Sequence, residues 1–142
     1  MRTFEVQGIA LPVPASIAFR YIADPAKLPE WTHAFKSVTS DRAVLETPNG
    51  SVEVGLEVRA SAGQGTIDWF IRFPNGNVAT AFSRIVEGQN GGSIYTFVLT
   101  APPVPLDQLE GTLEVQSNIL REELDKLARL LGERSMGSEP SQ

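Results

Sequence analysis

A single long amphipathic segment near the C-terminus constrains this chain most. From Leu106 to about Leu131 there is no proline and only one glycine, Gly111. Leucines recur at steps of three or four residues, which predicts one helix of about 26 residues, roughly 39 Å long, with one apolar face. The stripe consists of Leu106, Leu109, Leu113, Leu120, Leu124, Leu127 and Leu131. The rest of the chain is expected to cover this face.

The end of this helix sets the domain boundary. Gly132 is expected to stop the helix at its C′ position, and residues 133–142, which are small and polar, are expected to form a flexible tail. The chain of 142 residues has the length of one domain, which we place at residues 1–132.

The leucine stripe has one gap, between Leu113 and Leu120, where it passes through Gln116 and Ser117. One explanation is that this turn lies near the surface, or that neighbouring apolar residues rotate the face. The other is that a polar side chain points into a partly hydrated pocket, because a buried amide needs a hydrogen-bond partner. In the second case, Gln116 faces the pocket.

The middle of the chain alternates with a period of two residues. Val52, Val54, Leu56 and Val58 alternate with polar residues and glycine, which predicts a strand with one apolar face. Asn-Gly pairs at 49–50 and 75–76, and the run 89–92, predict tight turns between strands. About six antiparallel strands follow, because short turns join antiparallel neighbours. We place them near 34–40, 42–47, 51–60, 65–73, 77–87 and 93–100.

The first 31 residues predict a strand and two short helices. Weak alternation marks a strand over 2–11. Pro14 suits the first position of a helix that ends near Ile22, and Asp24 suits the N-cap of a second helix that ends near Trp31. The expected order is therefore strand, two short helices, six strands and one long helix, an α+β fold with a curved antiparallel sheet of about seven strands.

This order, together with three short motifs, resembles the START-like superfamily, also called Bet v 1-like or helix-grip. The motifs are LPVPASIAFRYI at 11–22, Asp24-Pro25, and Leu28-Pro29-Glu30-Trp31. The branch of polyketide cyclases/dehydrases and lipid-transport proteins is the most similar in pattern. The resemblance implies a sheet that grips the C-terminal helix, with a cavity between them for sterols, lipids, polyketides or plant hormones. No set of residues in this chain can be carried over as a cyclase active site.

Aromatic residues on the predicted strands are candidates for the wall of that cavity. Trp31 is expected near its entrance, followed by His33, the only histidine, which is either a surface residue or a proton donor to a bound carbonyl. Arg84 either turns outward or presents its guanidinium to an anionic ligand group. The sequence leaves open which face of the strand at 66–73 lines the cavity. The candidate ligand-binding residues are Trp31, His33, Trp69, Phe82, Arg84, Tyr95, Phe97, Leu113, Gln116 and Leu120.

Composition excludes several classes of site. The chain has no cysteine, so disulfides, thiolate metal sites and cysteine nucleophiles are excluded. A lone histidine cannot build a zinc site, and no phosphate-binding glycine loop is present, so no cofactor or metal is expected. The net charge of −5 disfavours a nucleic acid partner. The chain lacks a signal peptide and an apolar run of the ~20 residues that a membrane span needs, so we expect a cytoplasmic protein.

Three functions are compatible with these features. The first is a binding protein, without catalysis, for a small apolar or amphipathic molecule. The second is a cyclase or dehydratase acting on a polyketide-like substrate, in which His33, Arg84 or Tyr95 acts as an acid, a base or a polarising group. The third is a protein-interaction module whose groove accepts a partner segment, and a homodimer is also compatible with the sequence.

Overall fold

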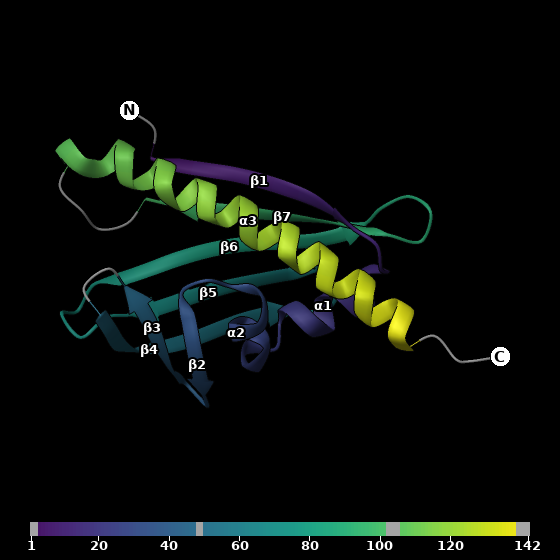
Figure 1. Cartoon of the computed structure of the whole chain (residues 1–142), viewed down its shortest axis with the longest axis horizontal. Coiled ribbons are helices and arrows are strands. Elements are labelled where there is room, and N and C mark those ends of the chain that lie inside the picture. The colour runs from purple at the N-terminus through teal and green to yellow at the C-terminus, as the bar shows by residue number, and fades with distance from the viewer. Residues whose placement is uncertain (1–2, 48–49, 102–105, 139–142) are drawn as a thin grey trace.

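One antiparallel sheet forms the body of the protein, and one long helix lies across it (Figure 1). The computed structural model describes residues 3–47, 50–101 and 106–138. The sheet has seven strands in the order β1-β7-β6-β5-β4-β3-β2, so every strand after β1 pairs with its neighbour in the chain. The strands are β1 (Phe4–Leu11), β2 (Phe35–Thr39), β3 (Arg42–Thr47), β4 (Gly50–Ser61), β5 (Thr66–Arg72), β6 (Val78–Glu87) and β7 (Ser93–Thr100). The predicted helix-grip α+β fold is confirmed.

Two short helices and a 3₁₀ turn connect β1 to β2. They are α1 (Ala15–Ile22), η1 (Pro25–Lys27) and α2 (Leu28–Trp31). Pro14 is the N-cap of α1 and not its first residue. Asp24 caps η1 as expected, because its Oδ1 accepts a hydrogen bond from the Ala26 amide at 3.1 Å.

Glycines at the turns allow the backbone to reverse direction. Gly76 has a φ of +91° in the turn between β5 and β6, where the Asn75 Oδ1 accepts from the Asn77 amide. Gly65 has a φ of +74°, and a Cβ there would lie 2.3 Å from the carbonyl oxygen of Ile85, so no other residue fits. The predicted turn at 48–50 lies partly outside the described residues.

The C-terminal helix, α3 (Leu106–Ser138), is longer than the sequence indicated. The expectation that Gly132 ends the helix is wrong, because the helix continues for six residues beyond it. Gly132 lies beside Pro12, and a Cβ there would make an ordinary contact 3.4 Å from the Pro12 Cγ. Beyond it, the Arg134 guanidinium lies 5.0 Å from the centre of the Tyr21 ring and 3.9 Å from the Glu30 carboxylate. Residues 139–142 of the expected tail lie outside the described residues.

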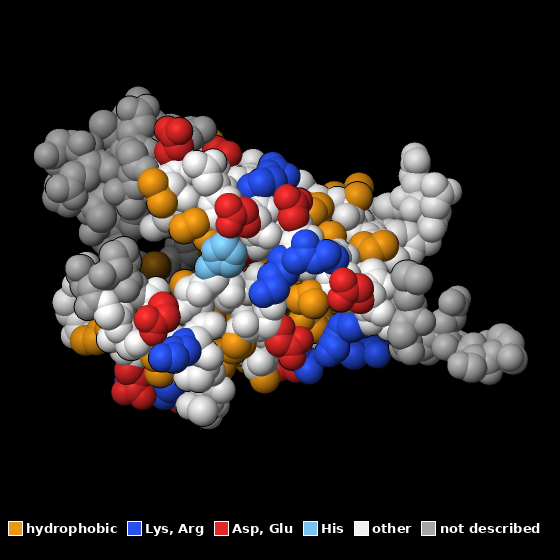
Figure 2. Space-filling model, in the orientation of Figure 1, with side chains coloured by type: hydrophobic (Ala, Val, Ile, Leu, Met, Phe, Trp, Pro, Cys, Tyr) orange, Lys and Arg blue, Asp and Glu red, His pale blue; other side chains and the backbone are white. Residues whose placement is uncertain are grey.

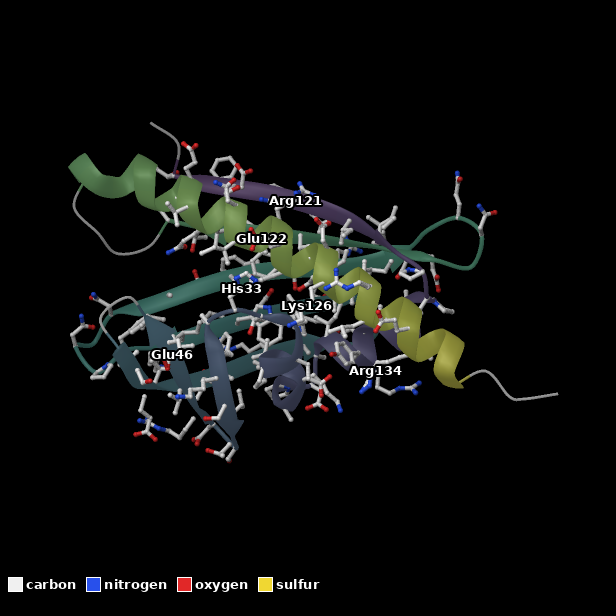
Figure 3. All side chains as sticks on the ribbon, viewed as in Figure 1. His33, Glu46, Arg121, Glu122, Lys126 and Arg134 are labelled. Carbon is white, nitrogen blue, oxygen red and sulfur yellow. The ribbon has the colours of Figure 1, made fainter. Side chains whose placement is uncertain are left out.

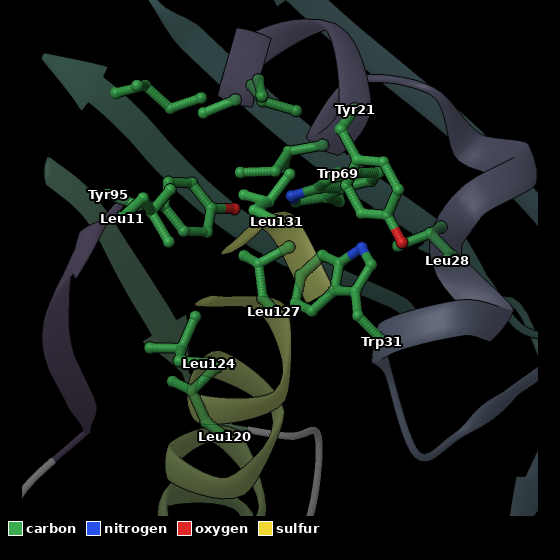
Figure 4. Packing of buried hydrophobic residues seen from close by; sticks show 14 of the residues in the cluster. Leu11, Tyr21, Leu28, Trp31, Trp69, Tyr95, Leu120, Leu124, Leu127 and Leu131 are labelled. Atoms are coloured by element: carbon green, nitrogen blue, oxygen red, sulfur yellow. The ribbon is translucent and has the colours of Figure 1, made fainter. Parts of the chain in front are cut away.

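The sheet has an inner face, which points toward α3, and an outer face. Register places Tyr95 beside Ile85, and Trp69 beside Ala81, on the inner face. These residues join the leucine stripe of α3 in one core cluster (Figure 4). Within the stripe, Leu124 and Leu127 are completely buried.

Burial on the inner face of β5, β6 and β7 changes along the strands. Toward one end, Ile67, Ile85 and Tyr95 are buried, with exposed fractions of 0%, 4% and 0%. Toward the other end, residues of the same face are only half-buried. We call this second set the open end, and it consists of Ile71, Ala79, Ala81, Phe97 and Leu99. The helix therefore covers the sheet tightly at one end and loosely at the other.

Candidate functional site

Small side chains occupy much of the inner face of the central strand β6. This face carries Ala79, Ala81 and Ser83 before the buried Ile85, whereas Val78 and Phe82 point outward. Phe82 is 39% exposed. Because a strand alternates its side chains between two faces, this distribution puts the small residues opposite the helix. A protein that only filled its core would place the large residues inward.

A hollow reaches toward this space from the surface. Figure 2 shows it beside His33, between the first half of α3 and strands β2 and β3, with a hydrophobic side chain in its depth. Two contacts fix the position of α3 over the open end. The Gln7 Nε2 of β1 donates to the Ser117 carbonyl at 2.8 Å, and Gln7 pairs in register with Phe97 of the open end.

Aromatic residues form the back wall of this space. Trp69, Tyr95 and Trp31 are 4%, 0% and 2% exposed. The indole Nε1 atoms of both tryptophans and the hydroxyl of Tyr95 are buried and make no hydrogen bond of ordinary geometry, although Trp69 and Ser83 lie close enough to the Tyr95 hydroxyl to act on its pKa. In Figure 4, the Tyr95 hydroxyl and the Trp69 nitrogen point toward each other across the core. Burial raises the pKa of Tyr95 above its ordinary value, so the hydroxyl stays protonated.

A buried polar network connects α3 to β1. Gln7 donates to the Ser117 hydroxyl at 2.9 Å, and that hydroxyl donates to the Glu5 carboxylate at 3.0 Å. Ser117 is 9% exposed and occupies the gap in the leucine stripe, between Leu113 at 0% and Leu120 at 3%. Gln7 was not among the residues that the sequence indicated for the site. The gap in the stripe was its signal on α3, but the weak alternation of residues 2–11 did not show which face of β1 is inward.

Gln116 is half-buried on the flank of the stripe. The helical period of 3.6 residues places Gln116 and Glu123 on the same flank, one heptad apart. Glu123 faces the loop after α2, because its Oε2 accepts a hydrogen bond from the His33 amide at 2.7 Å. Gln116 therefore lies on the side of α3 that borders the hollow.

His33 stands at the mouth of the hollow together with two glutamates. Its Nε2 lies 3.7 Å from the Oε1 of Glu122, and both side chains are largely exposed (Figure 3). Burial raises the pKa of the Glu123 carboxyl above its ordinary value, and the His33 amide partly offsets this effect. The mouth is therefore polar, whereas the space behind it is mainly apolar.

Two candidate residues lie on the other side of the sheet. Phe82 and Arg84 are exposed on the outer face of β6, although we expected them at the cavity. The Phe82 ring packs edge-on against the Phe70 ring, with the two ring centres 6.4 Å apart. The Arg84 Nε donates a hydrogen bond to the Gln64 carbonyl oxygen at 3.2 Å. Both faces of β6 carry apolar residues, so hydrophobicity alone could not assign its inner face. Trp31, which we expected near the entrance, is buried in the core at the end of α2. The remaining candidates lie on the inner face of the sheet, on α3 or at the mouth.

A second concavity lies on the outside of the molecule. An open groove of about 830 Å³ runs between α1 and the loop that joins β4 to β5. Its charged residues carry both signs, with Arg20 and Arg84 opposite Asp24 and Glu87. Its lining comes mainly from α1, the loop and the end of β6 that carries Ile85, away from the open end, and we do not assign the site to it.

Among the described residues, no helix combines the length and the apolar composition that crossing a membrane requires. The same residues contain no group of three or more histidine, aspartate or glutamate side chains that could hold a metal ion.

Comparison with solved structures identifies the fold. No family model matches the chain, and no curated protein matches its sequence. A START superfamily protein from Mycobacterium smegmatis superposes with a TM-score of 0.64 at 13% identity, covering 92% of this chain and 99% of that chain. The di-domain ARO/CYC protein BexL, from the BE-7585A biosynthetic pathway, has a TM-score of 0.72 at 14% identity, covering 91% of this chain and 46% of that chain.

The protein Ara h 8.0201 also superposes, with a TM-score of 0.61 at 16% identity, covering 92% of this chain and 97% of that chain. At such identities the comparisons define the fold alone. The chain has the START-like, Bet v 1-like helix-grip fold, as the sequence motifs indicated.

Proposed function

We propose that this protein binds a small hydrophobic or amphipathic molecule between the inner face of its sheet and the first half of α3. The observation that carries the proposal is the inverted distribution of side chains on β6. A central strand with alanines inside at the open end and Phe82 outside would leave apolar space for a ligand to fill. The half-buried open end beside it provides apolar surface, and burying this surface would favour binding.

Residues of strands β5, β6 and β7 and of helix α3 would contact the ligand. Trp69, Tyr95 and Phe97 would form the back wall, and the open end would form the floor. On α3, Leu113 and Leu120 would cover the ligand from above, with Gln116 beside them. Trp31 would border the site, and His33 would stand at its mouth.

Fold relatives are compatible with this proposal but do not choose between binding and catalysis, because one fold hosts several activities. The ARO/CYC protein BexL belongs to a biosynthetic pathway, whereas Ara h 8.0201 brings no reaction to the comparison. Of the three residues considered for an enzyme, Arg84 lies on the outer face, and His33 lies at the mouth. Tyr95 is a protonated phenol without a charged neighbour to activate it. This arrangement favours binding.

The test is a titration of intrinsic tryptophan fluorescence. Trp31 and Trp69, the only two tryptophans, are both buried in the core. A panel of sterols, neutral polyketide-like aromatics and long-chain alcohols should include a compound that changes the emission saturably. Trp69→Phe should remove most of the response, because Trp69 would touch the ligand.

Phe82→Leu is the matched control, because it changes an aromatic residue on the outer face of the same sheet. It should bind as the wild type does. If no compound of the panel binds below millimolar concentration, or if Phe82→Leu weakens binding as much as Trp69→Phe, the proposed site is wrong.

A further inference from the structure

We infer that the molecule bound at this site carries an uncharged oxygen, a ketone carbonyl or a hydroxyl, at its buried end, and that the site rejects carboxylates. This inference rests on the proposed function and specifies the class of ligand. It follows from the hydrogen-bonding capacity that the interior leaves unused and from the charges that border it.

The interior contains donors without acceptors. The Nε1 atoms of Trp31 and Trp69 can only donate, and the Tyr95 hydroxyl can donate or accept. Leaving such groups unpaired in an apolar core is costly, and native proteins rarely do so without a reason. An oxygen atom of a ligand would accept from these donors. A hydrocarbon would leave all three groups as they are.

These atoms border the space that we assign to the ligand. Ala81, which pairs in register with Trp69, belongs to the half-buried open end. Phe97, also of the open end, packs edge-on against the Tyr95 ring at 6.2 Å. A ligand lying on the open end would therefore meet the Trp69 and Tyr95 side chains at its inner terminus.

The charges around the site exclude a buried anion. Among the described residues, no lysine, arginine or histidine points inward from the sheet. The charged group that the polar network holds on the inner face is Glu5, which is itself an acid. A carboxylate would lose its hydration there without gaining a cation, which is strongly unfavourable.

Gln7 provides an independent argument for a neutral group. Its amide nitrogen is fixed by the Ser117 carbonyl, which can only accept, so the orientation of the amide is determined. Its Oε1 is buried without a partner. A ligand hydroxyl could donate to this oxygen, whereas a carboxylate would be repelled by it.

The experiment compares three probes of equal chain length at neutral pH: methyl decyl ketone, dodecanol and dodecanoate. Dissociation constants come from tryptophan fluorescence and are checked by calorimetry, below the concentration at which dodecanoate forms micelles. We expect the ketone and the alcohol to bind roughly tenfold or more tightly than the carboxylate, because only the carboxylate must bury a charge.

Tyr95→Phe tests the role of the polar group. It should weaken binding of the ketone by about threefold to tenfold, the usual effect of one lost hydrogen bond. The variant should melt close to the wild type, because the hydroxyl makes no hydrogen bond of ordinary geometry in the free protein and has only its contacts with Trp69 and Ser83 to lose. Tyr21→Phe is the matched control, since the Tyr21 hydroxyl donates to the Glu30 carboxylate at 2.7 Å, and it should bind the ketone normally.

Dodecanoate binding as tightly as the ketone would overturn this inference and leave the proposed binding function standing. Equal loss in Tyr95→Phe and Tyr21→Phe would also overturn it, because the effect would then not come from the interior polar group. If none of the three probes bound, and the wider panel failed as well, both the inference and the proposed function would be rejected.

Discussion

Two isoleucines on β5 report how tightly the sheet is covered at its two ends. Ile67 and Ile71 lie on the same strand and the same face, four residues apart. Ile67 is completely buried, whereas Ile71 belongs to the half-buried open end. Replacing each by alanine makes the same chemical change and the same loss of strand propensity, so the difference between the variants isolates packing.

The expected difference follows from the groups removed. Isoleucine to alanine removes three carbon groups, worth about 2.4 kcal/mol of transfer free energy when fully buried. A cavity term is added at a site that cannot collapse, so Ile67→Ala should cost about 3–4 kcal/mol. Ile71→Ala removes surface that is already partly exposed and leaves little new void, so we expect about 1–2 kcal/mol.

Urea denaturation followed by circular dichroism measures both free energies of unfolding, and equal m-values would show that the comparison is valid. If the two variants lose free energies of unfolding that differ by about 2 kcal/mol, the sheet is packed more loosely at the open end than at Ile67. Equal destabilisation would show that the sheet beneath the first half of α3 is packed solid, and the room proposed for a ligand would not exist.

Three further changes probe the mouth, the helix end and the stripe. Burial raises the pKa of Glu123, so its ionisation costs stability as the pH rises above about 4.3. The Glu123→Gln variant should therefore have a higher urea midpoint than the wild type at neutral pH. At a pH below about 4.3 the two midpoints should be equal. Arg134→Ala should cost about 1 kcal/mol by thermal melting, because it loses an exposed ion pair and the contact with the Tyr21 ring. Gln116→Leu should leave the melting temperature unchanged and shift preference from amphipathic toward apolar probes in the fluorescence assay, and unchanged preference would place this side chain outside the site.

Much of the fold was predictable because its strands carry local signals. The alternation from Val52 to Val58 and the Asn75-Gly76 turn depend only on neighbouring residues, and both appear where the sequence placed them. The order of elements then restricted the topology, because short turns join antiparallel neighbours.

The inner face of a strand was harder to predict than its position. On β6, Phe82 would be expected inside on hydrophobicity, yet the inner residues are smaller. On β1, Phe4 and Val6 are exposed by 55% and 50%, whereas Gln7 is buried against α3. Partners distant in sequence decide these cases, and a pattern read along one strand does not contain them.

The end of α3 shows a second limit. Glycine favours a C′ position but also occurs inside helices. At Gly132 the helix continues, and a Cβ there would make an ordinary van der Waals contact, 3.4 Å from the Pro12 Cγ. A single glycine in a helical pattern therefore does not by itself mark the end of the helix. The cytoplasmic location and the absence of a nucleic acid partner stay predictions.

Methyl NMR of the protein with and without methyl decyl ketone tests the central claim most directly, because valine, leucine and isoleucine methyl groups lie on both faces of the sheet. Adding the ketone should change the methyl chemical shifts strongly on the inner side, at Val52, Ile71, Leu99, Leu113 and Leu120. The methyl chemical shifts on the outer face, at Val6, Val78, Val86 and Ile94, should not change. Shifts confined to the outer face, or to the groove beside α1, would contradict the claim that the ligand lies between the sheet and α3.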